Sequence, residues 1–116
     1  MITTSDLKKI FSISNGSDVF YKMSPIKISY TQGVKEVMDK ANAHWLVSDV
    51  LVILTALKRK DFTAIKLTVE DNKAELSFTD GNRKVLYTQK YKYTDFPTGK
   101  WLFFYQNNVL MLNTEY

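Results

Sequence analysis

Residues 43–57 read AHWLVSDVLVILTAL and predict the central helix of the protein. At about 100° per residue, the polar side chains of His44, Ser48 and Thr55 fall on one narrow stripe. Almost every other residue is apolar, so we expect protein to cover most of the helix circumference. Asp49 lies in the apolar part, about 140° from His44 on a helical projection. The segment is not a membrane span, because Asp49 interrupts it and a span needs about 20 apolar residues.

The bulk composition predicts one globular domain without a cofactor. The chain has 116 residues, 45% hydrophobic and 24% charged, which suits a single domain with one core. It contains no cysteine, which excludes disulfides and thiolate chemistry, and its single histidine argues against a common zinc site. A net charge of +4 is compatible with a polyanionic partner but is well short of a dedicated nucleic-acid arm. The N-terminus has no signal-peptide core, so we expect a cytoplasmic protein without membrane association.

The segments before residue 43 predict two helices and two extended segments. Helical spacing and capping residues place the helices, and β-prone residues around Ser24-Pro25 place the extended segments. In chain order they are a helix capped by Thr4 or Ser5 and running through Phe11, a loop at Asn15–Asp18, extended segments at 19–21 and 26–30, a helix capped by Thr31, and a break at Asn42.

After Asp61 the apolar period changes from that of a helix to that of a strand. Turn residues such as Asp80-Gly81-Asn82 separate the alternating segments. Five strands follow, at about 65–69, 74–78, 84–93, 101–105 and 109–112. Short connections favour antiparallel pairing, so we predict an α+β fold in which N-terminal helices pack on one face of a roughly five-stranded antiparallel meander.

Asp49 and His44 are the candidates for catalysis. A carboxylate among apolar residues can acquire a raised pKa and an acid–base role, and His44 could act as a base. The sequence supplies no nucleophile or second acid at a matching spacing, so an enzyme centred on Asp49 and His44 is an alternative. The structural interpretation is that Asp49 accepts a hydrogen bond from an indole, a tyrosine or a cation, and that His44 is solvated or caps the helix.

Two groups of cations are candidates for binding. Lys90 and Lys92 alternate with tyrosines in the third strand, and Lys58-Arg59-Lys60 follows the central helix. Tyrosines and lysines together can form a nucleic-acid surface. Alternation sends them to opposite faces of one strand, so we expect the tyrosines to lie over the helices and the lysines in water. A nucleic-acid-binding module is therefore a second alternative.

The last two strands are apolar on both faces, which predicts a second covered surface. Either the N-terminal segments or another protein could cover it. If the N-terminal segments do not, a second copy is the simplest cover, and we predict a homodimer whose contact includes Phe104 or Leu110.

Several short sequence motifs resemble those of an uncharacterised family of small proteins from bacteria, plasmids and phages. These motifs are Tyr30-Thr31-Gln32-Gly33-Val34-Lys35, Ala43-His44-Trp45-Leu46 with Asp49, Ile65-Lys66-Leu67-Thr68-Val69, Tyr93-Thr94-Asp95-Phe96-Pro97 and Val109–Leu112 followed by Glu115-Tyr116. The resemblance covers most of the chain from about Phe20. The family usually has Asp at position 32, an aromatic residue at position 44 and Trp at position 65, and it implies no catalytic residues.

We therefore expect a non-enzymatic protein that acts by binding another protein. Some anti-CRISPR proteins are small, cysteine-free proteins of mobile elements, and by this analogy the most specific expectation is an inhibitor of an RNA-guided nuclease. The expected contact residues are Lys58, Arg59, Lys60, Lys90, Lys92, Phe104 and Leu110. We expect neither a metal nor nucleic acid as the direct ligand.

Overall fold

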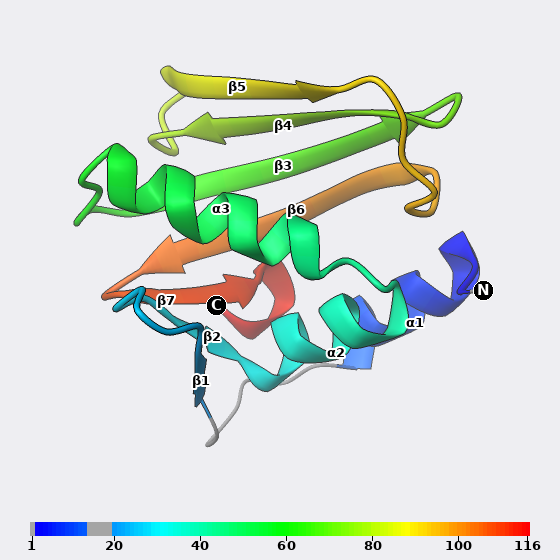
Figure 1. The fold of residues 1–116 in the computed structure, drawn as a ribbon, viewed down its shortest axis with the longest axis horizontal. Helices are drawn as coiled ribbons and strands as arrows, with labels where there is room; N and C mark the ends of the chain where they lie inside the picture. Colours follow the sequence, from blue (N-terminus) through cyan, green and yellow to red (C-terminus); the bar gives the residue numbers. More distant parts are fainter. Residues whose placement is uncertain (1, 14–19) are drawn as a thin grey trace.

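The computed structural model describes residues 2–13 and 20–116 and shows an α+β fold (Figure 1). The predicted loop at Asn15–Asp18 and the first residue of the predicted segment at 19–21 lie outside the described residues. The helices are α1 (Thr4–Ile13), α2 (Gln32–Lys40), α3 (His44–Ala56) and the short 3-10 helix η1 (Asn113–Glu115). The strands are β1 (Phe20–Lys22), β2 (Ser29–Thr31), β3 (Thr63–Glu70), β4 (Lys73–Thr79), β5 (Val85–Tyr91), β6 (Gly99–Gln106) and β7 (Val109–Leu112).

The sheet has seven strands in the order β1-β2-β7-β6-β3-β4-β5, so the prediction of a five-stranded meander is corrected. Only β3, β4 and β5 form a meander. The chain then returns to pair β6 with the free edge of β3, where Ile65 is opposite Phe103 and Leu67 is opposite Trp101. The two short extended segments, β1 and β2, join the sheet beyond β7. The pairing of β2 with β7 is parallel, which makes the sheet mixed.

The connection between β5 and β6 accounts for this strand order. It must cross three strand spacings, about 14 Å, and its seven residues can span more than 20 Å. The backbone N–H of Thr94 donates to the Asn72 carbonyl in the β3–β4 turn at 2.8 Å. The indole of Trp101 donates to the Pro97 carbonyl at 3.0 Å. Phe96 is buried between Trp45 and Trp101, so the motif from Tyr93 to Pro97 anchors the return of the chain.

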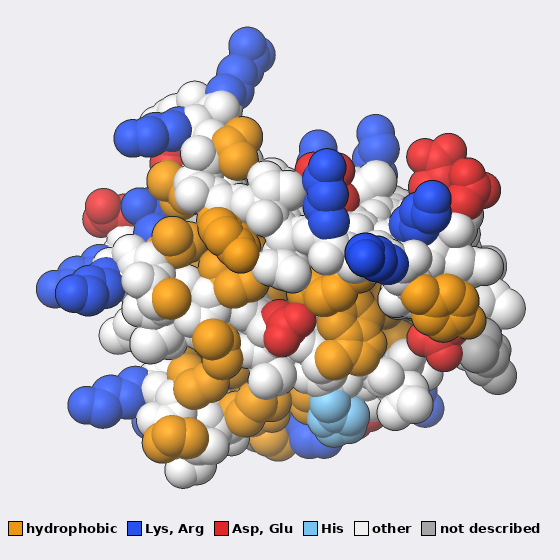
Figure 2. All heavy atoms as spheres, turned by 45° about the horizontal axis from the view of Figure 1, so that its top comes forward, with side chains coloured by type: hydrophobic (Ala, Val, Ile, Leu, Met, Phe, Trp, Pro, Cys, Tyr) orange, Lys and Arg blue, Asp and Glu red, His pale blue; other side chains and the backbone are white. Residues whose placement is uncertain are grey.

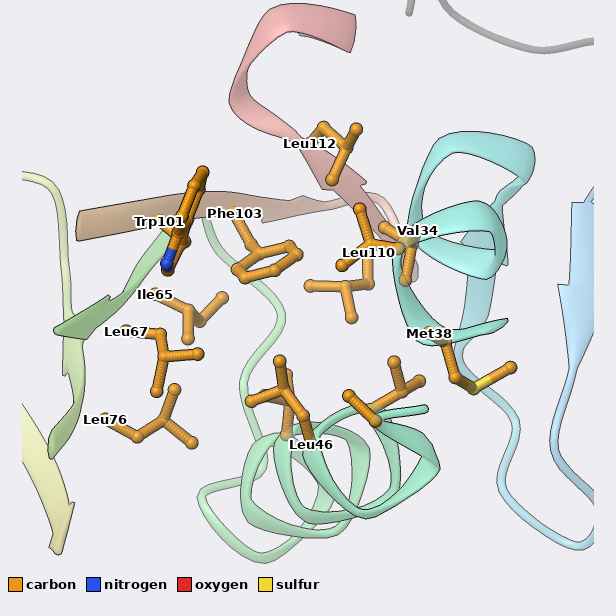
Figure 3. Packing of buried hydrophobic residues seen from close by; sticks show 14 of the residues in the cluster. Val34, Met38, Leu46, Ile65, Leu67, Leu76, Trp101, Phe103, Leu110 and Leu112 are labelled. Atoms are coloured by element: carbon orange, nitrogen blue, oxygen red, sulfur yellow. The ribbon is translucent and has the colours of Figure 1, made fainter. Parts of the chain in front are cut away.

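The helices cover one face of the sheet, as predicted (Figure 1). Figure 3 shows α3 facing a layer of sheet side chains that includes Leu67, Leu76 and Phe103, with α2 beside it. Five residues of α3 are buried, namely Leu46, Val47, Val50, Leu51 and Leu54. The predicted break before α3 is confirmed, because Asn42 has a φ of 51°, a left-handed conformation that asparagine tolerates. No helix in the described part of the chain is long and apolar enough to cross a membrane.

Thr31 caps α2 as predicted, accepting a hydrogen bond from the Val34 N–H at 3.3 Å. Its hydroxyl also donates to the Glu115 carboxylate at 2.7 Å, and that carboxylate accepts from the Leu112 N–H at 2.9 Å. A Cβ on Gly33 would lie 2.6 Å from a Glu115 oxygen. The C-terminal turn therefore docks its carboxylate at the start of α2, and Gly33 leaves the space for it. This contact joins the Thr-x-Gly-Val motif to the Glu-Tyr ending of the chain.

The cap of α1 is Thr3 rather than Thr4 or Ser5. The Thr3 hydroxyl accepts from the Asp6 N–H at 3.1 Å, and the Asp6 carboxylate accepts from the Thr3 N–H at 3.2 Å. These two hydrogen bonds form a reciprocal capping box. The hydrogen bond from the Thr3 N–H to the carboxylate lowers the pKa of Asp6. The Thr4 hydroxyl instead donates to the Thr98 carbonyl at 2.8 Å, which ties α1 to the start of β6.

Candidate functional site

A group of exposed and half-buried side chains lies between α3 and β5. Two of the six large hydrophobic residues that stay exposed in the described chain belong to it, Val52 on α3 and Tyr87 on β5. We call this area the α3–β5 surface, and it consists of Trp45, Asp49, Val52, Tyr87 and Tyr91. Figure 2, in which the β5 edge is turned toward the viewer, shows apolar side chains across this region with an acidic group among them and basic side chains at the rim. Exposed apolar side chains that gather on one face are candidates for a binding surface.

This surface exists because α3 lies over the middle of the sheet and leaves its edge uncovered. Phe78 of β4 is fully buried, whereas Tyr87, its neighbour on β5, is 42% exposed. Coverage therefore ends between these two strands. On α3 the half-buried Trp45 and Asp49 form one stripe with the exposed Val52 and Ala56, at helical spacings of four, seven and eleven from Trp45. The expectation that protein covers most of the helix circumference is therefore wrong, because Val52 is 52% exposed.

Asp49 lies at the centre of this surface and accepts a hydrogen bond from a tyrosine, one of the three donor types expected for it. The Tyr91 hydroxyl donates to the Asp49 carboxylate at 2.6 Å, a charge-assisted hydrogen bond. The rings of Trp45 and Tyr91 meet edge to face at 5.0 Å between centroids. Burial raises the pKa of the Tyr91 hydroxyl, and the hydrogen bond to Asp49 raises it further. The contact joins α3 to the edge strand, which is the structural role that the sequence suggested for Asp49.

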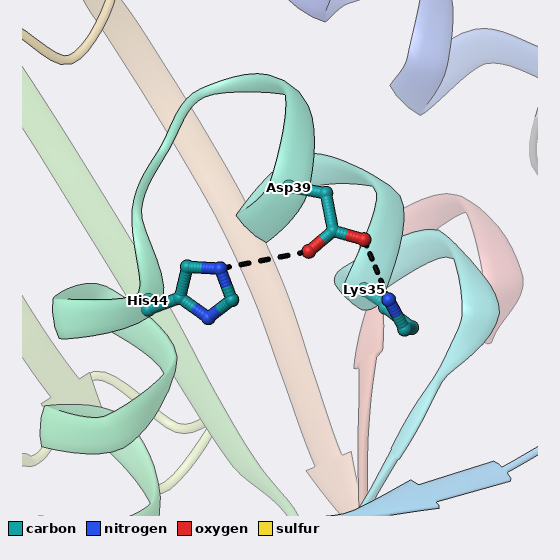
Figure 4. Close-up of polar contacts among 3 residues, drawn as sticks. All are labelled: Lys35, Asp39 and His44. Carbon is teal, nitrogen blue, oxygen red and sulfur yellow. Dashed lines mark hydrogen bonds and ion pairs between the residues drawn. The ribbon is translucent and has the colours of Figure 1, made fainter.

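His44 has a different partner and does not join Asp49. Figure 4 shows His44 beside Asp39 of α2, with an Nε2 to Oδ1 distance of 3.7 Å, and Lys35 on the other carboxylate oxygen at 2.6 Å. The hydrogen bond to Asp39 raises the pKa of Lys35. The three side chains are substantially exposed, so this is a solvated link between two helices. In residues 2–13 and 20–116, no group of three acidic or histidine side chains could hold a metal ion.

The three cations after α3 divide into one structural residue and two exposed ones. Arg59 donates from Nε to the Thr63 hydroxyl at 2.9 Å and from its terminal nitrogen to the Phe62 carbonyl at 3.1 Å. It therefore holds the turn that leads into β3. Lys58 and Lys60 are exposed, and Lys58 has a φ of 54° where the helix ends.

Lys90 and the tyrosines lie on opposite faces of β5, as the alternation predicted. Tyr91 is opposite Ala74 on the helix side, whereas Lys90 is opposite Glu75 on the other side. Lys92 follows the strand and is exposed. The arrangement does not bring the lysines and tyrosines onto one stacking platform.

Phe104 and Leu110 lie on opposite faces of the sheet. Leu110 is 1% exposed on the helix side, so it is unavailable to a second copy of the folded chain. Its predicted role in a dimer contact is corrected for this reason. Phe104 is on the other face, where the rings of Phe62 and Tyr116 pack edge-on against it at 5.0 and 5.2 Å. The C-terminal residue, rather than the N-terminal segment, is the part of the described chain that covers this aromatic cluster.

Comparison with known protein families identifies the family of this chain. The sequence model described as "Family of unknown function (DUF6876)" matches residues 3–116. The chain belongs to the DUF6876 family. No curated protein and no solved structure matches this DUF6876 protein significantly. The motifs that carried the resemblance lie at the Thr31 cap, on α3, in β3, in the crossing to β6 and in β7 with the C-terminal turn.

The sequence pattern did not single out the α3–β5 surface as a whole. Val52 and Tyr87 are ordinary apolar residues of a helix and a strand, and their exposure depends on which strand lies at the edge. The only local signal was Asp49 within an apolar stripe, together with Trp45 one turn before it.

Proposed function

We propose that this DUF6876 protein acts by binding another protein through the α3–β5 surface, without catalysing a reaction. The supporting observation is the stripe of α3 that contains Trp45 and Val52, which joins β5 through the ring contact of Trp45 with Tyr91. Aromatic residues on a rigid helix and strand are typical of the energetic centre of protein interfaces. The carboxylate and phenol at the centre contact each other at 2.6 Å, so they fix the surface in shape.

The narrower form of this proposal names an RNA-guided nuclease as the partner, so that the protein would be an inhibitor of CRISPR immunity. It is supported only by the analogy with small proteins of mobile elements. A blocking protein needs a stable surface and no reacting groups, and the α3–β5 surface satisfies that requirement.

The test is affinity capture with two matched variants. Tagged wild-type protein is incubated with lysates of bacteria that carry a CRISPR system or are infected by phage, and bound proteins and nucleic acids are identified separately. Val52→Glu places a charge on the α3–β5 surface. Phe20→Glu is the control, because Phe20 is 53% exposed and Val52 is 52% exposed, but Phe20 is on β1 at the other edge of the sheet.

We expect a protein partner that the wild type and Phe20→Glu retain and Val52→Glu loses. A partner that Val52→Glu retains and Phe20→Glu loses would place the binding surface at the other edge. The nuclease proposal additionally requires that the captured protein be an RNA-guided nuclease, and that the wild type but not Val52→Glu inhibit its cleavage of DNA.

A further inference from the structure

The edge strand β5 offers backbone groups as well as side chains. It is the last strand of the sheet and has seven residues, whereas the opposite edge strand, β1, has three. Within the described sheet, only β4 pairs with β5. The N–H and C=O groups on the outer side of β5 therefore have no strand partner, and such an edge is a template for an added strand.

The side chains near this edge are aromatic on the helix face and cationic on the other face and at both ends. Tyr87 is exposed on the helix side, opposite Phe78, whereas a register shift between Phe78 and Thr79 sets the exposed Val85 opposite Thr79 on the other face. Lys90 is also exposed on that other face. From Gly81 to Thr94 the chain contains no acidic residue and four exposed cations, namely Arg83, Lys84, Lys90 and Lys92.

We propose that β5 accepts an extended acidic segment of the partner protein as an eighth strand of the sheet. This inference rests on the proposed function, because it names how the partner of the α3–β5 surface binds. Apolar residues at alternate positions of the added strand would contact Tyr87 and Tyr91, which share the helix face of β5. Acidic residues at the positions between them would face Lys90, since opposite charges on neighbouring strands stabilise pairing.

The charges favour a different protein over a second copy of this chain. Pairing of β5 with a second copy would bring the exposed cations of the two edges together, namely Arg83, Lys84, Lys90 and Lys92 of each chain. Like charges on neighbouring strands are destabilising. Each copy also carries a net charge of +4.

The probe is a blocked eight-residue peptide that alternates valine and glutamate. One control peptide has lysine in place of glutamate, and another has proline at a central valine, which removes a donor needed for strand pairing. Amide hydrogen exchange of the whole protein is followed residue by residue by NMR. Lys90→Glu tests the charge, and Lys66→Glu is its control, because Lys66 is an exposed lysine on the same face of the sheet but in β3.

We expect exchange to slow at every second amide of β5, by about tenfold when the peptide occupies nine-tenths of the protein, because exchange then proceeds from the free tenth. Only the outward-pointing amides change in this way, so an apolar contact without strand pairing would not give the alternation. Added salt and Lys90→Glu should each weaken binding, whereas Lys66→Glu should leave it unchanged.

Three results would overturn the inference. One is no alternating protection in β5 at millimolar peptide, and another is equal protection by the lysine or proline peptide. The third is alternating protection in β5 that rises with protein concentration when no peptide is present, which would make a second copy the occupant. If the peptide fails while Val52→Glu still abolishes capture of the partner, the α3–β5 surface is retained and only strand addition is rejected.

Discussion

The contact between Gly33 and Glu115 predicts that Gly33→Ala destabilises the protein when Glu115 is present and stabilises it when Glu115 is replaced by alanine. A methyl group at Gly33 would lie 2.6 to 2.8 Å from the carboxylate atoms of Glu115, closer than a real Cβ can approach. The carboxylate is the end of a flexible side chain, so it can move away. In doing so it loses its hydrogen bonds from the Thr31 hydroxyl and the Leu112 N–H, at 2.7 and 2.9 Å.

The magnitude follows from two opposing terms. Hydrogen bonds to a charged group are worth about 1.5–3 kcal/mol each, and the half-buried position of Glu115 favours the lower end, so the loss of two costs about 3 kcal/mol. Alanine in place of glycine in a helix returns up to about 1 kcal/mol. Gly33→Ala should therefore lower the free energy of unfolding by about 2 kcal/mol, or the melting temperature by about 8 °C for a chain of this size.

In the Glu115→Ala background the clash is absent, and Gly33→Ala should instead raise the free energy of unfolding by about 0.5–1 kcal/mol. Urea denaturation of the wild type, both single variants and the double variant measures the coupling between the two sites. Glu115→Gln is the control, because it keeps an oxygen acceptor without the charge. If Gly33→Ala has the same effect with and without Glu115, the docking of the C-terminal carboxylate on α2 is not what requires glycine.

Three further predictions concern the other named contacts. Asp49→Ala should lower the free energy of unfolding by about 1–3 kcal/mol in urea denaturation, and Asp49→Asn, which still accepts from Tyr91, by less; equal stability of Asp49→Ala and the wild type would contradict the contact at 2.6 Å. The pKa of Tyr91 is raised, so its proton stabilises the folded state below the ordinary pKa of 10.0, and this stability is lost as the pH rises above that value. Tyr91→Phe should therefore reduce the loss of stability at alkaline pH in thermal unfolding, and an unchanged pH dependence would refute this. A homodimer through Phe104 should show twice the chain mass of 13.5 kDa in light scattering and return to monomer on Phe104→Lys, and a dimer indifferent to that change would use another surface.

The local elements could be predicted because their signals are local. The 3.6-residue period of α3, the cap at Thr31 and the two-residue period after Asp61 each depend on neighbouring residues. The strand order could not be predicted in the same way. It depends on Phe96 packing against Trp45 and on the backbone contact of Thr94 with Asn72, which join residues far apart in the chain.

The candidate site was predicted in part for the same reason. Asp49 was identified because a carboxylate on an apolar stripe conflicts with burial. Val52 was expected in the core, because an apolar residue on an apolar helix gives no sign that the sheet edge beside it is open. Leu110 and Phe104 were correctly placed on doubly apolar strands, but only the packing of Tyr116 shows which face the chain covers itself.

The most direct measurement is hydrogen–deuterium exchange of the complex between this DUF6876 protein and its captured partner, compared with the free protein. Binding through the α3–β5 surface predicts slower exchange in α3 and in β5, the two elements that carry Val52 and Tyr87. Slower exchange confined to β1 and the C-terminal turn, with α3 and β5 unchanged, would contradict it.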